Sequence, residues 1–278
     1  MPSHPALSAG RVAVITGAAS GIGLAAAHKL AALGMKLCLA DVNEEALHKA
    51  TDSLPKGAEV LAIKTDVSRS DEVKHLKTAA YDRFGDVAFL LSNAGIEGGG
   101  KLFGSPERWQ QILGVNLWGA IHCIQHFAPA MMGQRAPGAI VTTGSKQGIT
   151  CPPGDTAYNV SKAGLKALTE ALAHALRNED CQVSAHLLIP GFTYTGLTRA
   201  RGVDEKPAAA WTSEQVVDFM IEGMAAGDFY ILCPDNDVPR ATDEKRIAWA
   251  AGDIIENRPA LSRWHPDFKD AFDKYMKS

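Results

Sequence analysis

The chain has 278 residues, of which 46% are hydrophobic, 21% charged and 7% aromatic, a balance typical of a folded globular protein. The 28 Lys and Arg residues against 31 Asp and Glu residues give a net charge of −3, which provides neither a broad basic surface for nucleic acid nor a polybasic membrane anchor. No stretch approaches the ~18 uninterrupted apolar residues of a membrane span. A small-molecule partner is therefore expected, with no nucleic acid and no membrane.

The cysteines and the first ten residues bear on the compartment. Five cysteines are scattered without a CxxC pair or a Cys/His cluster at metal-ligand spacing, so buried thiols in a reducing compartment and no metal site are predicted. Residues 1–10 lack the cationic start and apolar core of a signal peptide. We expect a cytoplasmic protein.

Short apolar runs alternate with longer amphipathic segments along the chain. The runs predict seven strands, at residues 12–16, 36–40, 59–63, 87–91, 139–143, 183–188 and 229–232. Helices are predicted between and after them, at 21–33, 44–54, 70–84, 106–132, 157–177, 213–226, 240–256 and 266–276. Strands that are apolar throughout, each followed by a helix, indicate an α/β fold: a doubly wound, Rossmann-like parallel sheet covered on both faces, within a single domain spanning 1–278.

A glycine-rich loop, Thr-Gly-Ala-Ala-Ser-Gly-Ile-Gly at residues 16–23, follows the first strand directly. Gly17 suits a tight turn, Gly21 leaves room for a pyrophosphate, and Gly23 allows close helix packing, while the helix N-terminus offers free N–H groups. The spacing is Gly-x3-Gly-x-Gly and not the general dinucleotide fingerprint GxGxxG. The alternative is a turn that merely connects strand and helix. The position of the loop, directly after the first strand, favours dinucleotide binding.

Asp41 ends the second strand, 18 residues after Gly23. A carboxylate there can accept both ribose hydroxyls of NAD and repels the 2′-phosphate of NADP. No Arg or Lys in the glycine loop or just after Asp41 could bind that phosphate. NAD is therefore the predicted cofactor, although an acidic residue at a strand end can also be purely structural.

Four motifs together resemble the short-chain dehydrogenase/reductase family over about residues 10–235. They are the loop at 16–23, Asn93-Ala94-Gly95 after the fourth strand, Tyr158-x3-Lys162, and Pro190-Gly191 after the sixth strand. The resemblance implies that the loop residues Ser20 and Ile22 contact the cofactor, that Asp66 and Val67 form the adenine pocket, and that residues 93–95 form the floor of the cofactor site. It also implies that Pro190, Gly191 and Thr195 hold the nicotinamide carboxamide.

Tyr158 and Lys162 are four residues apart in a predicted helix, so their side chains share one face. A phenol titrates near pH 10, and a neighbouring ammonium stabilises the phenolate and lowers that pKa. The resemblance implies that Tyr158 is the general acid/base and that Lys162 also holds the nicotinamide ribose. An ordinary surface pair is the alternative if the glycine loop is ignored.

Two more residues match catalytic positions of that family. Ser145 follows the fifth strand, thirteen residues before Tyr158, and its hydroxyl would orient the substrate oxygen. Asn116 matches an Asn that holds a water in a proton relay to the Lys, and a mid-helix Asn is otherwise unfavourable. Lys146, beside the serine, is an unusual neighbour that we expect at the substrate.

Several remaining features have a structural interpretation. His122 and His126 are four apart without a third ligand, so packing is favoured over metal binding, and Cys151 lacks a base and is read as an inert thiol. The resemblance implies that residues 192–215 form the substrate lid, where Arg199 and Arg201 either pair with an anionic substrate or, as is more usual for exposed Arg, are only solvated. Residues 235–278 form a C-terminal extension whose aromatic side chains are expected to pack on the body or on a partner subunit.

The predicted function is NAD-dependent hydride transfer between nicotinamide and a secondary alcohol or ketone. A catalytically silent NAD sensor or scaffold on the same fold is one alternative, and an NAD-dependent lyase or epimerase is another. The resemblance also implies a homodimer or homotetramer assembled through the long helices at 106–132 and 157–177.

Overall fold

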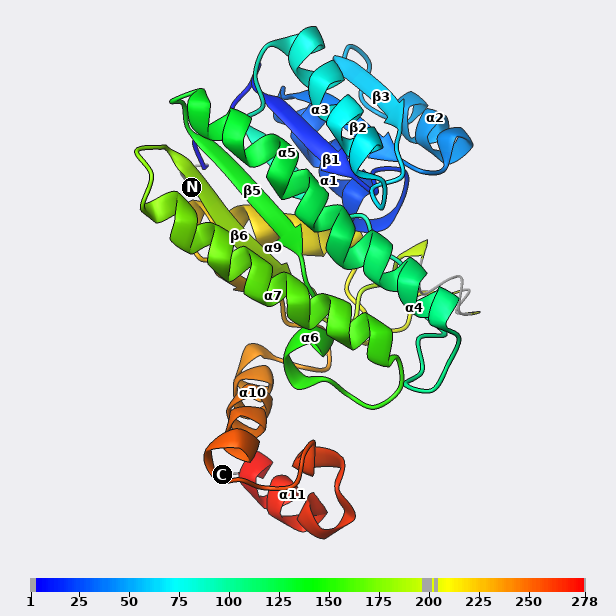
Figure 1. Ribbon diagram of the computed structural model, residues 1–278, viewed down its shortest axis with the longest axis vertical. Helices are drawn as coiled ribbons and strands as arrows, with labels where there is room; N and C mark the ends of the chain where they lie inside the picture. Colours follow the sequence, from blue (N-terminus) through cyan, green and yellow to red (C-terminus); the bar gives the residue numbers. More distant parts are fainter. Residues whose placement is uncertain (1–3, 197–201, 203–204, 278) are drawn as a thin grey trace.

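The computed structural model describes residues 4–196, 202 and 205–277, and its centre is a parallel sheet (Figure 1). Seven strands lie in the order β3-β2-β1-β4-β5-β6-β7, and every neighbouring pair is parallel. The strands are β1 (Val12–Thr16), β2 (Lys36–Asp41), β3 (Val60–Lys64), β4 (Phe89–Ser92), β5 (Gly138–Thr143), β6 (Val183–Ile189) and β7 (Tyr230–Leu232). The predicted seven-stranded, doubly wound sheet is confirmed, with strand ends shifted by one or two residues.

Helices cover both faces of this sheet. On one face, α1 (Gly21–Ala32), α2 (Glu44–Asp52) and α9 (Ser213–Ala226) pack their apolar side chains against the strands. On the other face lie α3 (Ser70–Phe84), α5 (Gly119–Gly133) and α7 (Thr156–Arg177). Burial on both sides is why the strands are apolar throughout and do not alternate.

The strand order reverses between β1 and β4. The chain runs outward from β1 through β2 to β3, then returns to place β4 on the other side of β1. Loops leaving the carboxyl ends of β1 and β4 therefore diverge and leave a crevice, the usual ligand position in such sheets. The glycine loop and residues 93–95 both begin at this crevice.

The helix predicted at 106–132 is not uniform. It consists of α4 (Pro106–Leu113), a π-helical turn η1 (Gly114–Trp118) and α5. Asn116, in the π turn, donates through Nδ2 to the Ile96 carbonyl at 2.9 Å and accepts from the Ile96 amide at Oδ1 at 2.8 Å. A π turn accommodates an extra residue, and here it aims a buried amide side chain at a loop instead of at solvent.

The C-terminal extension forms a small group of helices beside the sheet layers, at the bottom of Figure 1. It contains α10 (Arg240–Ile255), the short 3₁₀ turns η2 (Ser262–Trp264) and η3 (Pro266–Phe268), and α11 (Lys269–Lys277). Trp249 is buried inside this group, where its Nε1 donates to Ser262 Oγ at 2.8 Å and its ring meets Phe272 and Tyr275. Trp249 therefore packs against aromatic side chains of the extension itself, and packing of the extension on the body or on a partner subunit stays a prediction.

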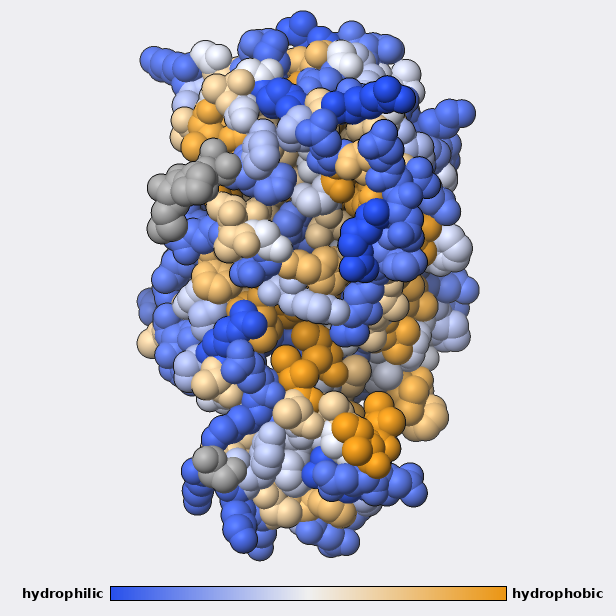
Figure 2. Space-filling view, turned by 90° about the vertical axis from the view of Figure 1, so that its left-hand side faces the viewer, coloured by the Kyte–Doolittle hydropathy of each residue, from blue (hydrophilic) through white to orange (hydrophobic). Residues whose placement is uncertain are grey.

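The surface in Figure 2 is hydrophilic over much of its area, and apolar side chains gather mainly in its lower half, toward the C-terminal helices. Ile254 and Ile255, at the end of α10, are the most exposed of these helices' large apolar side chains, at 86% and 81%. Within the ranges described above, none of the helices combines the length and apolar character that a membrane crossing requires.

Candidate active site

A cavity of about 600 Å³ opens at the carboxyl ends of the central strands. Among the residues of the sequence-based site, only Gly23 and Asn116 do not line it. The lining includes Gly17, Ser20, Gly21, Ile22, Asp41, Asp66, Val67, Asn93, Ala94, Gly95, Ser145, Tyr158, Lys162, Pro190, Gly191 and Thr195. Segments that are far apart in the sequence thus share one cavity of the size that a small ligand needs.

The glycine loop passes very close to other backbone. Gly17 has a φ of +65°, and a Cβ there would lie 2.8 Å from the Ala94 Cα. A Cβ on Gly23 would lie 2.1 Å from the Gly17 carbonyl oxygen. Both positions therefore require glycine, Gly17 for its backbone conformation and both for lack of space. Gly23 acts behind the cavity wall, which explains its absence from the lining.

Asn93 joins three segments at the cavity floor. Its Nδ2 donates to the carbonyls of Thr16 and Gly17 at 3.2 and 3.4 Å, and its Oδ1 accepts from Thr143 Oγ1 at 3.1 Å. The side chain thus connects the end of β1, the glycine loop and the end of β5. Its observed contacts are structural and hold the floor of the cavity in shape.

Asp41 directs its carboxylate toward the glycine loop. Oδ2 accepts from the Ala19 amide at 3.1 Å, and Oδ1 accepts from the Asn43 amide at 2.9 Å. A carboxylate has about four lone-pair sites, so two remain for further donors such as a pair of ribose hydroxyls. The following side chain, Val42, is 61% exposed and adds no charge.

At the far end of the cavity, Asp66 and Val67 follow β3. Asp66 Oδ1 accepts from both the amide and the hydroxyl of Ser68, at 2.9 and 2.7 Å, which fixes the turn before α3. Val67 is 5% exposed and packs where a side chain on Gly119 would collide with it. The pair provides one polar and one apolar wall of the cavity.

Tyr158 lies in the first turn of α7, which is positioned by its N-cap. Asp155 accepts from the Tyr158 amide at 3.3 Å through Oδ1 and from the Gly98 amide at 2.5 Å through Oδ2. The cap thereby ties the tyrosine to the loop after β4. The Lys162 Nζ lies 5.5 Å from the centroid of the Tyr158 ring, as the four-residue spacing predicts.

Lys162 is a buried cation. The residue is 5% exposed, and its Nζ donates to the Thr143 carbonyl at 2.7 Å. Burial lowers the pKa of Lys162 from 10.5 to about 8, against the opposing effect of the Glu97 carboxylate, which also lines the cavity. The amine is thus charged at neutral pH and close to its titration range.

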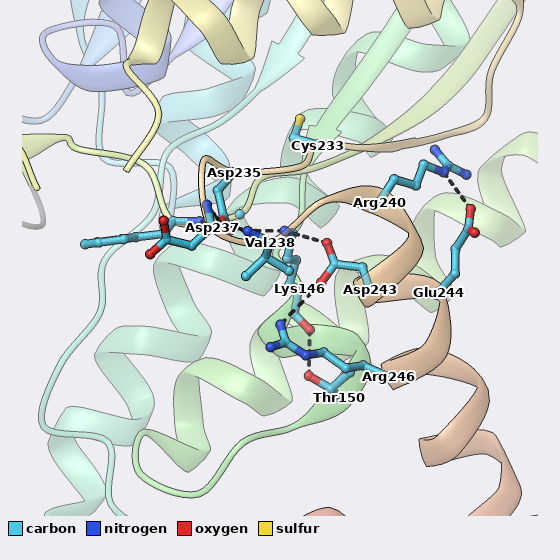
Figure 3. Close-up of polar contacts among 12 residues, drawn as sticks. Lys146, Thr150, Cys233, Asp235, Asp237, Val238, Arg240, Asp243, Glu244 and Arg246 are labelled. Atoms are coloured by element: carbon cyan, nitrogen blue, oxygen red, sulfur yellow. Dashed lines mark hydrogen bonds and ion pairs between the residues drawn. The ribbon is translucent and has the colours of Figure 1, made fainter. Parts of the chain in front are cut away.

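Ser145 lines the cavity just after β5, and its Oγ accepts from the Gln147 amide at 3.2 Å. The neighbouring Lys146 also lines the cavity, but its ammonium is occupied. Nζ lies 3.2 Å from Asp235 Oδ2 and 2.5 Å from Asp243 Oδ2 (Figure 3). The expected substrate contact therefore competes with two carboxylates from the C-terminal part of the chain.

Asn116 is 1% exposed and lies behind the cavity. Besides its bonds to Ile96, its Nδ2 donates to Ser161 Oγ at 3.1 Å. A Cβ on Gly95 would lie 3.5 Å from Asn116 Oδ1 and 3.7 Å from Lys162 Nζ, so the amide and the amine flank the same glycine. The relay role predicted for Asn116 stays a prediction.

His122 and His126 have local partners, and Cys151 is a free thiol. His122 Nδ1 is 3.0 Å from the Val67 carbonyl, and His126 Nε2 is 2.9 Å from Ser70 Oγ. Among the residues that the structure describes, no three His, Cys, Asp or Glu side chains are arranged to hold a metal ion. Burial raises the pKa of the Cys151 thiol, which makes it less nucleophilic.

Sequence reasoning missed two residues that shape this site. Asp155 carries a recognisable signal, because Asp three residues before Tyr158 at a helix start is a typical N-cap. Asp235 carries none, because its partner Lys146 is 89 residues away. At the expected lid, Tyr194 N donates to the Trp211 carbonyl at 2.9 Å, while Arg199 and Arg201 lie outside the described residues.

Comparison with known proteins agrees with this architecture. The family model for short chain dehydrogenase matches residues 11–206. The 1-deoxy-11-beta-hydroxypentalenate dehydrogenase of Streptomyces exfoliatus is 31% identical over 262 residues, covering 91% of this chain and 94% of that protein. The chain therefore belongs to the short-chain dehydrogenase family of oxidoreductases.

Solved structures agree as well. A short chain dehydrogenase/reductase from Burkholderia phymatum, in complex with NAD, superposes with a TM-score of 0.83 at 37% identity, covering 93% of this chain and 97% of that one. A metagenomic short-chain oxidoreductase in complex with NADP gives a TM-score of 0.68 at 28% identity, covering 82% and 98%. Similar folds thus bind either nicotinamide cofactor.

Proposed function

We propose that the protein is an NAD-dependent oxidoreductase that acts on a secondary alcohol or the corresponding ketone, with Tyr158 as general acid/base. The observation that carries this proposal is that Tyr158, Lys162 and Ser145 line the same cavity as the glycine loop. A cofactor bound along the loop would extend toward these three side chains.

The chain's own residues fit a dinucleotide. Gly17 carries no side chain and lies close to the Ala94 backbone, and the first turn of α1 offers its amides to phosphate. Asp41 retains acceptor capacity for ribose hydroxyls and would repel a 2′-phosphate, which supports NAD over NADP. Asp66 and Val67 would surround the adenine, and Lys162 would hold the nicotinamide ribose. Pro190, Gly191 and Thr195 would contact the carboxamide.

In the proposed reaction, NAD supplies the hydride acceptor, and the residues handle the proton and the orientation. The Tyr158 phenolate removes the hydroxyl proton of the alcohol, and Ser145 Oγ hydrogen-bonds the same substrate oxygen. The Lys162 ammonium stabilises the phenolate. In the reverse direction Tyr158 returns the proton to the carbonyl oxygen.

A direct test mixes the purified protein with NAD and a panel of secondary alcohols while NADH absorbance is followed, with NADP in parallel. Turnover of at least one alcohol with NAD is expected. Absence of turnover in both directions, despite measurable NAD binding, would favour a silent NAD-binding protein. Product analysis separates oxidation from elimination or epimerisation.

Further proposals concern organisation. Residues 1–278 would form one domain with 192–215 as substrate lid, in line with the hydrogen bond that joins Phe192 and Trp211 at its base. All five cysteines are free thiols, which is consistent with a reducing, cytoplasmic environment.

The protein is also proposed to form a homodimer or homotetramer through α4–α5 and α7. Trp118 and Val160 on these helices are 54% and 44% exposed, and burial in an interface would remove them from water. Light scattering at micromolar concentration is expected to give a multiple of the 29.6 kDa chain mass. A stable monomer would contradict this assembly.

A further inference from the structure

The residue next to Ser145 is held by charges that come from the far end of the chain. Lys146 is 18% exposed in its side chain, and the Asp235 and Asp243 side chains are each 6% exposed. Asp235 follows β7 and Asp243 lies in the first turn of α10, so the ammonium connects the Ser145 segment to both (Figure 3). Ion pairs this buried are sensitive to the loss of one partner, because the remaining charge stays desolvated.

Asp235 is itself fixed on several sides. Its Oδ1 accepts from the amides of Asp237 and Val238 at 3.3 and 2.8 Å, and its Oδ2 accepts from the Phe192 amide at 3.3 Å. A side chain on Gly191 would lie 2.7 Å from both Asp235 Oδ2 and Lys146 Nζ. The ion pair therefore packs directly against the cavity wall that follows β6.

The Ser145 segment is equally confined on its other side. Lys146 N donates to the Pro190 carbonyl at 3.4 Å, and the short helix α6 (Gln147–Thr150) starts at the next residue. A Cβ on Gly148 would lie 2.4 Å from the Lys162 carbonyl carbon, so α6 abuts α7 at the lysine. Movement of Lys146 would thus displace Ser145 relative to Lys162 and Tyr158.

We propose that Lys146, Asp235 and Asp243 are positioning residues that hold Ser145 at the substrate end of the cavity, so that attachment of the C-terminal extension sets catalytic competence. This inference rests on the proposed function for its kinetic consequence. Its structural consequence, an ordered Ser145 segment, is independent of any substrate.

The test compares Asp243→Asn and Lys146→Met with Lys146→Arg and with the control Glu244→Gln. The control breaks the Arg240–Glu244 pair, which lies at 2.9 Å on the same helix and is more than half exposed. We expect kcat to fall by about tenfold in Asp243→Asn and more in Lys146→Met, since small misplacements of a catalytic group are costly. NAD affinity should stay within about twofold, Lys146→Arg should recover part of kcat, and Glu244→Gln should be unchanged.

Amide hydrogen exchange over residues 144–151 is measured on the same proteins, with residues 12–18 as internal reference. Faster exchange confined to 144–151, together with the kcat loss, supports the proposal. Unchanged exchange in Asp243→Asn and in Lys146→Met overturns it, as does faster exchange with unchanged kcat or an equal loss of NAD affinity. If the wild-type protein turns over no alcohol or ketone, the proposed function fails instead, and the exchange result still decides whether these ion pairs order the segment.

Discussion

On the glycine-loop side of the cavity a close approach of backbone at Gly17 shapes the wall, whereas on the Ser145 side the wall depends on charged side chains from remote segments. A Cβ on Gly17 would lie 2.8 Å from the Ala94 Cα, just beyond the ends of adjacent strands, and Asp41 accepts backbone amides near its own strand end. Lys146, by contrast, is held by Asp235 and Asp243 from beyond β7. Because the close backbone approach at Gly17 shapes the first side, we expect that side to reject added volume, while the charge of Asp41 acts on cofactor choice and not on the shape of the wall. The shape of the Ser145 side should instead depend on the charges of Lys146, Asp235 and Asp243.

The largest effect expected on the Ser145 side is that of Tyr158→Phe. The ring and its packing remain while the transferable proton is lost, so turnover should fall by about 10²–10⁴. NAD affinity, measured by titration, should be nearly normal. Tyr230→Phe removes a phenol that bonds to Glu170 outside the cavity and serves as control. Near-normal turnover in Tyr158→Phe would exclude this residue as the acid/base.

On the glycine-loop side, Gly17→Ala adds a methyl group at a φ of +65° and 2.8 Å from Ala94 Cα. Strain and overpacking together should cost about 2 kcal/mol of folding stability. If the loop moves away from Ala94 to relieve the clash, its amides leave the phosphate position, and NAD affinity should fall by roughly thirtyfold. Gly85→Ala is the matched control, because Gly85 also has a positive φ, of +85°, but nothing within 4 Å of the added atom. The control should lose some stability and no affinity. Equal NAD affinities for all three proteins would show that the close approach does not shape the site.

Cofactor choice should depend on Asp41. NAD is expected to bind at least about tenfold more tightly than NADP, roughly 1.4 kcal/mol, because the carboxylate repels a 2′-phosphate. Asp41→Ala combined with Val42→Arg should shrink or invert this ratio in parallel titrations. Glu44→Gln, an exposed acid at the start of α2, should leave it unchanged. Equal affinity of the unaltered protein for both cofactors would contradict the assignment.

The smallest expected effect concerns Lys162. Burial lowers the pKa of Lys162 to about 8, so the amine is charged below that pH and neutral above it. A charged donor binds ribose hydroxyls more strongly, so affinity for ADP-ribose should fall by up to about tenfold as pH rises from 7 to 9.5. ADP-ribose is used because it lacks the positive nicotinamide ring. Lys162→Met should bind more weakly and show a flatter pH profile, and a profile as steep as that of the wild type would assign the titration to another group.

Much of the fold could be predicted because it depends on local pattern. Apolar runs followed by amphipathic segments predict a parallel sheet, and the structure moves strand ends by at most two residues. The exceptions are tertiary. Asn116, in the π turn, is hydrogen-bonded to Ile96 in a distant loop, and Trp249 finds its partners within the extension instead of on the sheet. Helical periodicity predicts neither the Asn116–Ile96 hydrogen bonds nor the contacts of Trp249.

The sequence by itself determined the elements of the candidate site that need only spacing. The glycines at 17, 21 and 23 directly follow a strand, and Tyr158 comes four residues before Lys162. The backbone geometry of these short segments already specifies the tight loop and the shared helix face. Only the tertiary structure decided which charges neutralise Lys146, how deeply Lys162 is buried, and how Asp155 ties α7 to the loop after β4. These depend on contacts between residues many positions apart, whose distances and desolvation are set when the layers pack together.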